Sequence, residues 1–177
     1  MLQMPFLARL PGVIPAGTVN DSQLCSNLDF AQTFLDYANA SDAPDVSKMQ
    51  GQSLRTILSG QTPEEWRDAI YYRYWMHLAH HNIPGHYGVR NDRYKLVFFH
   101  GLPLDASLGK GDFQPSTAGW ELYDLQLDPQ EINNVYEKPE YAPVVHLLKN
   151  RLLELKQKYG DHDEAYPELM RLRKKLW

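Results

Sequence analysis

The chain has 177 residues, of which 43% are hydrophobic and 23% are charged, a balance typical of a globular protein with one sizeable core. Its formal charge of -4 at pH 7 gives no general attraction for phosphate backbones, so nucleic acid is not an expected partner. No apolar run approaches the roughly 18 residues that span a bilayer, so neither a transmembrane segment nor a membrane partner is expected.

Residues 1 to 62 have the pattern of an α/β layer. Residues 6–10 are expected to form a strand that leads into a proline-glycine turn. Apolar side chains at positions 30, 31, 34, 35 and 38 share one helix face and predict a helix over 26–38. A shorter helix, closed by a glycine, is expected over 53–59.

Residues 63 to 177 have the pattern of a small antiparallel sheet. Strands are expected over 69–75, 94–100 and 119–125, because aromatic and β-branched residues are frequent there. In the last of these, Trp120 and Leu122 alternate with polar neighbours, as in a strand with one buried face. The sequence Thr-Pro-Glu-Glu at 62–65 is typical of a capped helix start.

Apolar residues at steps of three or four predict a helix over 143–159 that covers the sheet. The basic tail, 171–177, is most simply a solvated end rather than a binding patch. The predicted fold class is therefore α/β plus α+β. An incomplete α/β portion occupies residues 1–62, and an antiparallel sheet packed with a helix occupies 63–177.

The only cysteine, Cys25, excludes an intrachain disulfide and a zinc site built from several thiolates. It lies at an expected helix start, where the helix dipole would lower the pKa of its thiol, but a small buried cysteine is the commoner reading of such a position. The phosphate-binding Gly-x-x-x-x-Gly-Lys, the Gly-x-Ser-x-Gly and the His-Glu-x-x-His signatures are absent from the sequence.

Histidines gather between residues 77 and 100. His77, His80 and His81 would share a helix face, but the Pro-Gly turn that follows limits any helix to a short one. Zinc requires three or four ligands that carboxylates commonly support, and no acidic residue occurs between positions 68 and 92. No metal site is therefore expected.

His86 differs from the other histidines because it lies where a loop enters a strand, from which a side chain can point into a cleft. A structural or merely exposed histidine remains an equal alternative on this pattern alone. Arg90, Arg93 and Lys95 suit an anion such as sulfate, phosphate or carboxylate, but charges of this kind also keep an edge strand soluble.

Five segments, in the same order, resemble type I sulfatases, the formylglycine-dependent branch of the alkaline-phosphatase superfamily. The His-Tyr-Gly-Val-Arg pattern from His86 is most similar to glucosamine 6-sulfatases and mucin-desulfating enzymes. Gln32, Gln130 and Ile132 depart from the family pattern without touching its chemistry. The matching segments are 4–18, 26–36, 49–54, 87–96 and 121–135, all within the family's C-terminal portion.

The resemblance implies an alkaline-phosphatase-like fold and hydrolysis of sulfate esters. It also implies a formylglycine made from the cysteine of Cys-x-Pro-x-Arg, beside a calcium ion held by carboxylates. Cys25 is followed by Ser26, Asn27 and Leu28, so it is not that cysteine. The nucleophile and the calcium ligands are expected before residue 1. This chain is therefore expected to contain no catalytic residue, to bind no cofactor itself and to be inactive alone.

The resemblance further implies that this portion lines one wall of the substrate cleft. His86 is the strongest candidate for a contact to a sulfated carbohydrate, through a sugar hydroxyl or the sulfate, and His81 and Arg90 are weaker candidates. The partner of the chain would be the missing N-terminal sulfatase region. Export to the periplasm or secretion is expected from the family.

Two other readings stay open. The chain could be a stand-alone binding module for a sulfated or anionic glycan that uses His86, Arg90 and Arg93, or a truncated product with a miscalled start. If residues 1–60 lack the rest of their sheet, an apolar edge at 6–8 is exposed, so poor solubility or association through 1–60 is expected.

Overall fold

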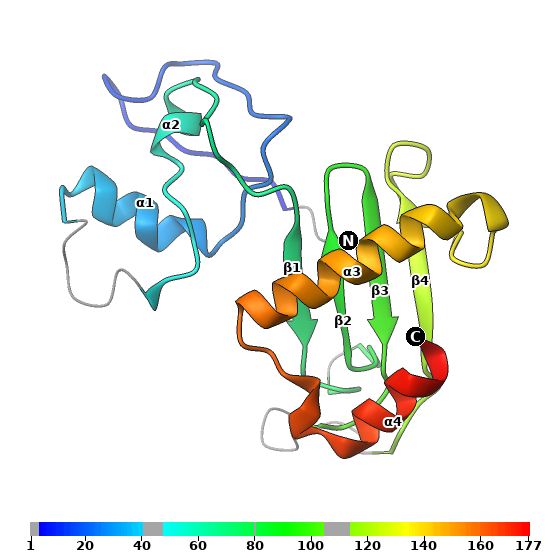
Figure 1. The fold of residues 1–177 in the computed structure, drawn as a ribbon. Coiled ribbons are helices and arrows are strands. Elements are labelled where there is room, and N and C mark those ends of the chain that lie inside the picture. Colours follow the sequence, from blue (N-terminus) through cyan, green and yellow to red (C-terminus); the bar gives the residue numbers. More distant parts are fainter. Residues whose placement is uncertain (1–3, 41–47, 80, 105–113) are drawn as a thin grey trace. The chain divides into compact units, whose positions relative to one another are not determined.

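A computed structural model describes residues 4–40, 48–79, 81–104 and 114–177. The chain divides into two compact units, Met1–Ile70 and Tyr71–Trp177 (Figure 1). Among the described residues, no helix is both long and apolar enough to cross a membrane.

The described residues of the first unit form helices α1 (Asp29–Tyr37) and α2 (Arg55–Leu58), which confirms both helices expected there. The strand expected over 6–10 is wrong: this segment is irregular, and Leu7 is 95% exposed. A strand needs a neighbouring strand for its backbone hydrogen bonds, and the described part of this unit supplies none. Phe6 instead stacks on Phe30, with ring centroids 5.0 Å apart.

One buried carboxylate, Asp29, organises the first unit. It accepts hydrogen bonds from the backbone N–H groups of Ser26 (2.7 Å) and Gln52 (2.9 Å), and the Arg67 guanidinium binds both of its oxygens. The helix start expected over 62–65 is wrong, because the described chain there is irregular. Shortly after this segment, Arg67 binds Asp29, a residue far away in the sequence. Such a tertiary contact can outweigh the local preference of residues 62–65 for a helix start.

The second unit is built on a four-stranded sheet in the order β1 (Ile70–Tyr74), β2 (His86–Arg90), β3 (Tyr94–Phe99), β4 (Gly119–Asp124). The strands expected over 69–75, 94–100 and 119–125 are confirmed. β2 and β3 pair antiparallel with His86 opposite Phe99, and β3 and β4 with Phe98 opposite Trp120. Alternate residues of β4 are buried, as the pattern of Trp120 and Leu122 predicts.

Helix α3 (Ala142–Lys158) crosses one face of this sheet, and it confirms the helix expected over 143–159 (Figure 1). Leu148, Leu152 and Leu155 are buried on the side of the helix that faces β2 and β3. The fully buried sheet residues Tyr87, Val89, Leu96, Phe98 and Leu122 complete this core.

The basic tail, 171–177, keeps Arg171, Lys174 and Lys175 exposed, as a solvated end would, but it is also ordered as a helix. It forms helix α4 (Pro167–Leu176), in which Leu169 is fully buried. The Trp120 indole N–H donates to the Leu176 carbonyl at 2.9 Å, and the Trp177 ring packs edge-on against Trp120 at 5.1 Å. The sequence did not predict the helix or its packing, because the Trp120 partner lies far from the tail in the sequence.

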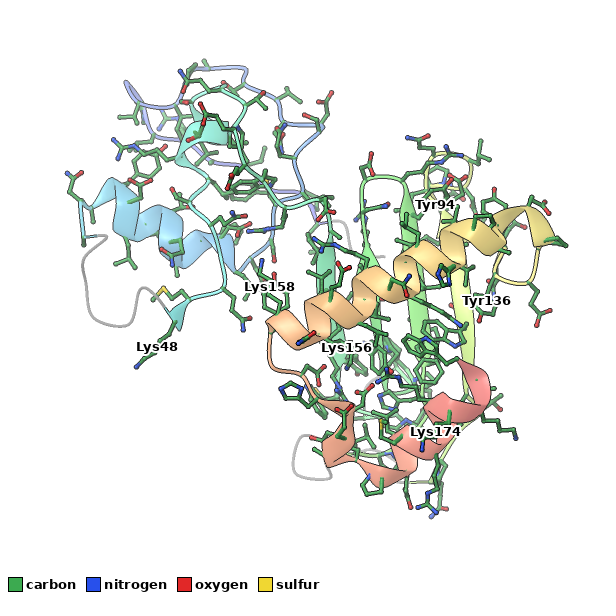
Figure 2. The ribbon with its side chains drawn as sticks, viewed as in Figure 1. Lys48, Tyr94, Tyr136, Lys156, Lys158 and Lys174 are labelled. Carbon is green, nitrogen blue, oxygen red and sulfur yellow. The ribbon has the colours of Figure 1, made fainter. Side chains whose placement is uncertain are left out.

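Charged side chains form a buried network between the sheet, α3 and α4. Asp163, in the short 3-10 helix η4 (Asp163–Ala165), is completely buried. It binds Lys156 at 2.8 Å and Arg173 at 3.1 Å, and it accepts a hydrogen bond from the Tyr87 hydroxyl at 3.1 Å. Lys156 also lies over the Tyr87 ring, 4.1 Å from its centroid, and Figure 2 shows this lysine on α3 beside the sheet.

Asp161 extends the network to β1. It accepts hydrogen bonds from the Tyr71 hydroxyl, from Arg73 and, at 3.0 Å, from Lys156. Burial alone would raise the pKa of Asp161, but the Tyr71 hydroxyl and the charges of Lys156 and Arg73 outweigh burial and hold this pKa below its ordinary value. Five segments of the second unit thus meet at two carboxylates.

His100, the residue after β3, is another buried polar residue of this unit. Its Nδ1 accepts a hydrogen bond from the Leu102 backbone N–H at 3.1 Å. Burial, reinforced by the charge of Arg73, lowers the pKa of His100 to about 3. A Cβ on Gly85 would lie 2.6 Å from His100 Cε1, so the close approach of the two segments requires glycine at position 85.

Replacing Asp163 with asparagine should destabilise the 177-residue chain by about 3 to 5 kcal/mol, because it removes the carboxylate partner of Arg173 and leaves Lys156 with Asp161 alone as its counter-charge among the described residues. Urea unfolding of the two proteins measures the change in free energy. Glu164→Gln is the matched control: this neighbouring carboxylate is exposed, so its replacement should cost under about 0.5 kcal/mol. Equal midpoints for the two variants would contradict the network's role.

The free energy of unfolding should fall as the pH is lowered from 7 to 5. The folded-state pKa of His100, about 3, lies below its ordinary value of about 6.5, so only the unfolded chain binds this proton between those values. The contribution of His100 to the free energy of unfolding is therefore complete above about pH 6.5 and is lost as the pH falls toward about 3.

The His100 contribution amounts to about 2 kcal/mol between pH 7 and 5, since each pKa unit corresponds to about 1.4 kcal/mol. His100→Asn should remove that share of the loss, as measured by urea unfolding at both pH values. His146→Ala, which removes an exposed histidine on α3, should leave the loss unchanged. A His100→Asn chain with the full pH dependence would refute the assignment.

Candidate substrate-contact site

His86, the first residue of β2, lies on the face of the sheet opposite α3. Side chains alternate along a strand, and Tyr87 points toward α3, where it meets Lys156 and Asp163. The strand register extends this second face across the sheet, and we call it the distal face. It comprises Tyr72 and Tyr74 of β1, His86, Gly88 and Arg90 of β2, Lys95, Val97 and Phe99 of β3, and Gly119, Glu121 and Tyr123 of β4.

Aromatic rings enclose the His86 imidazole. Tyr74 stacks on it with centroids 5.2 Å apart, Phe99 lies at 4.8 Å, and Tyr72 meets it edge-on at 5.7 Å. Burial lowers the pKa of His86, and the hydrogen bond to the Pro84 carbonyl only partly opposes this. His86 is therefore a neutral, half-buried imidazole at pH 7.

The turn that leads into β2 is held at Gly85 from both sides. The buried His77 accepts a hydrogen bond from the Gly85 backbone N–H at Nδ1 (3.0 Å), and its Nε2 donates to the Gln114 carbonyl (2.9 Å). The Gly85 carbonyl accepts from the backbone N–H groups of His100 (3.0 Å) and Gly101 (3.1 Å). His86 therefore follows a residue whose two backbone polar groups are both fixed.

The structure does not bring the three predicted contact residues together. His81 is exposed in the turn, with a φ of +57°, and no contact joins it to His86 within the described residues. Arg90 ends β2, four residues after His86, so their Cα atoms are about 13 Å apart along the strand.

Arg90 differs from His81 and His86 because it has a buried hydrogen-bond donor without a partner among the described residues. This donor is its Nε, which is inaccessible to solvent. Arg93, one of the three cations considered for anion binding, instead forms an ion pair with Asp124 at 2.8 Å. Lys95, the third of these cations, likewise forms an ion pair with Glu131.

The histidines that a metal ion would have to use are His77, His80 and His81. His80 lies outside the described residues. Both ring nitrogens of His77 already hold backbone partners, and no group of three His, Cys, Asp or Glu side chains suited to a metal occurs in the described part of the chain. Cys25 is not activated either: burial, followed by the charge of Asp29, raises the pKa of its thiol.

Sequence reasoning missed the rings around His86 and the role of His77. The alternation in Tyr71-Tyr72-Arg73-Tyr74 was a usable signal, because it places Tyr72 and Tyr74 on one face. No local pattern indicates that this face receives His86, since that depends on how β1 lies beside β2. Nor does any pattern pair His77 with Gly85.

The comparisons with known proteins agree with this architecture. The family model described as N-sulphoglucosamine sulphohydrolase, C-terminal, matches residues 1–158. An N-acetylglucosamine-6-O-sulfatase of Bacteroides thetaiotaomicron is 37% identical over 163 residues, which are 91% of this chain and 26% of that protein. An ulvan-active sulfatase of Formosa agariphila is 27% identical over 173 residues, 90% of this chain and 34% of that protein.

Solved structures show the same fold. A structure in complex with its substrate, D-glucosamine-2-N,6-O-disulfate, is 36% identical with a TM-score of 0.63, and the match covers 78% of this chain and 25% of that one. A 2-O glycosaminoglycan sulfatase, at 19% identity and a TM-score of 0.54, supports the fold alone; 77% of this chain and 25% of that one are covered.

The chain spans 26% of the length of its N-acetylglucosamine-6-O-sulfatase relative, and the portion matched is the C-terminal one. These relatives confirm the expected fold class, in which a small antiparallel sheet packs with helices in a mixed α/β chain. The 177 residues therefore belong to the sulfatase family, as the C-terminal portion that the N-sulphoglucosamine sulphohydrolase model describes.

Proposed function

We propose that this chain is the substrate-recognition portion of a carbohydrate sulfatase and that His86 contacts the sulfated sugar. One observation carries the proposal: the His86 ring is held among aromatic rings at the head of β2, and no residue of the described chain hydrogen-bonds its Nε2. Binding sites for small molecules combine an aromatic lining with a few placed polar atoms in this way.

The substrate class follows from the relatives. One is an N-acetylglucosamine-6-O-sulfatase, and another was solved with D-glucosamine-2-N,6-O-disulfate as its substrate. Both are more than 35% identical to this chain. We therefore propose a sulfated glucosamine as the substrate of the whole protein.

The described residues of this chain do not fit the calcium ion of the family, and Cys25 does not fit its formylglycine. The buried carboxylates Asp29 and Asp163 are already neutralised by arginine and lysine, and the described residues contain no metal-binding group of three. Cys25 lacks the required motif. We therefore propose that the nucleophile and the calcium ion belong to the region that the match does not cover.

The isolated 177-residue chain should not hydrolyse an aryl sulfate, because sulfate transfer needs an activated nucleophile and charge neutralisation. A chromogenic aryl sulfate assay checks this, with the longer protein that carries the segment as the positive control. Hydrolysis by the isolated chain that mutation of its own residues abolishes would overturn the proposal. Equilibrium binding of a sulfated sugar by the isolated chain would favour the stand-alone binding module.

His86→Ala in the longer sulfatase should lower kcat/KM at least about tenfold, a loss of about 1.4 kcal/mol, because a directed polar contact to the sugar is removed. Steady-state kinetics on N-acetylglucosamine 6-sulfate measures the effect. His146→Ala is the control, because that histidine is exposed on α3, and it should leave kcat/KM unchanged. A His86→Ala enzyme with normal kinetics and a normal Tm would remove His86 from the site.

A further inference from the structure

We propose that His86 accepts a hydrogen bond from the sugar through Nε2 and does not bind the sulfate oxygens. The inference rests on the proposed function and deepens it, because it names the kind of group recognised: an O–H or N–H donor of the sugar. It follows from the bond that the other ring nitrogen makes and from the surroundings of the ring.

The Pro84 carbonyl determines which nitrogen of His86 carries the proton. Nδ1 lies 2.8 Å from this oxygen, and a carbonyl oxygen can only accept a hydrogen bond. Nδ1 must therefore carry a hydrogen. In a neutral imidazole the other nitrogen is then a lone-pair acceptor, so Nε2 offers a lone pair.

The Pro84 carbonyl is well placed for this role because the next residue is fixed. Gly85 donates to His77 and accepts from His100 and Gly101. Both backbone polar groups of Gly85 are hydrogen-bonded, so the backbone beside the Pro84 carbonyl has little freedom to turn. The tautomer of His86 is thus set by a backbone group that neighbouring segments immobilise.

The surroundings keep the ring neutral. Tyr72 and Tyr74 of β1 and Phe99 of β3 pack against it and supply no formal charge. The nearby ionic groups are Lys95 on β3, which disfavours the imidazolium, and Glu121 on β4, which favours it. Their influences oppose each other, and burial is the dominant effect on the ring.

The chemical consequence is selectivity between two parts of one substrate. Sulfate ester oxygens are acceptors without a proton, so they would face the Nε2 lone pair with no hydrogen between them. A hydroxyl or an amide N–H of the sugar can donate to Nε2 directly. Recognition by His86 therefore falls on the sugar, and cations elsewhere must hold the sulfate.

The tautomer can be measured on the 177-residue chain itself. Two-dimensional ¹⁵N–¹H spectra of the histidine rings at pH 7 should show Nδ1 of His86 protonated and Nε2 unprotonated, with the signal assigned by its loss in His86→Asn. A protonated Nε2, in either the other neutral tautomer or the imidazolium, would overturn the inference. This result does not depend on catalysis, so it is separate from the fate of the proposed function.

The contact is tested with substrate analogues in the longer sulfatase. N-acetylglucosamine 6-sulfate is compared with its 3-deoxy, 4-deoxy, 3-fluoro and 4-fluoro forms and with a form whose amide N–H is replaced by an ester oxygen. Fluorine and the ester oxygen keep acceptor character but cannot donate. At one position, removal of the donor should lower kcat/KM at least about tenfold in the wild type and under about twofold in His86→Ala.

The analogue results separate the two hypotheses. A fluoro analogue that retains full activity where the deoxy form does not would mean that His86 donates, and this overturns the inference alone. If His86→Ala responded to every analogue as the wild type does, the proposed contact would fail. The position that responds identifies the donor as a hydroxyl or as the amide N–H.

Discussion

The second unit depends on the burial of Asp163 among cations. A buried carboxylate is tolerated only when its charge is matched and its oxygens are hydrogen-bonded, and Lys156, Arg173 and the Tyr87 hydroxyl meet both conditions. Because these partners come from α3, α4 and β2, satisfying one charge requires three elements to dock together. It also turns Tyr87 toward α3, and strand alternation then places His86 on the distal face.

A second buried carboxylate has the same effect in the first unit. Asp29 joins the start of α1 to the backbone at Gln52 and to Arg67. Around it the unit leaves large apolar side chains exposed, including Leu7 and Phe34 at 95% and 71%. An organised interior beneath an apolar surface is consistent with a segment that functions as part of a longer sulfatase.

The proposed division of labour follows from what each region contains. This chain offers a neutral imidazole whose tautomer is set by the backbone, and its described residues contain no group of three side chains suited to a metal. A neutral acceptor discriminates by hydrogen-bond direction, which suits the uncharged part of a sulfated sugar. Recognition and sulfate-ester chemistry would thus be carried by different parts of one protein.

The sequence by itself determined the elements whose signal is local: the helix over 142–158, the strands of the sheet and the family segments around His86 and Glu121. It predicted a strand at 6–10 that does not form, and it did not predict that the tail packs as part of α4, because both outcomes depend on distant partners. Only the tertiary structure separated His81 and Arg90 from His86. It also decided which ring nitrogen of His86 carries the proton. The strand register, the burial of the ring and the position of the Pro84 carbonyl all result from packing that no local pattern encodes.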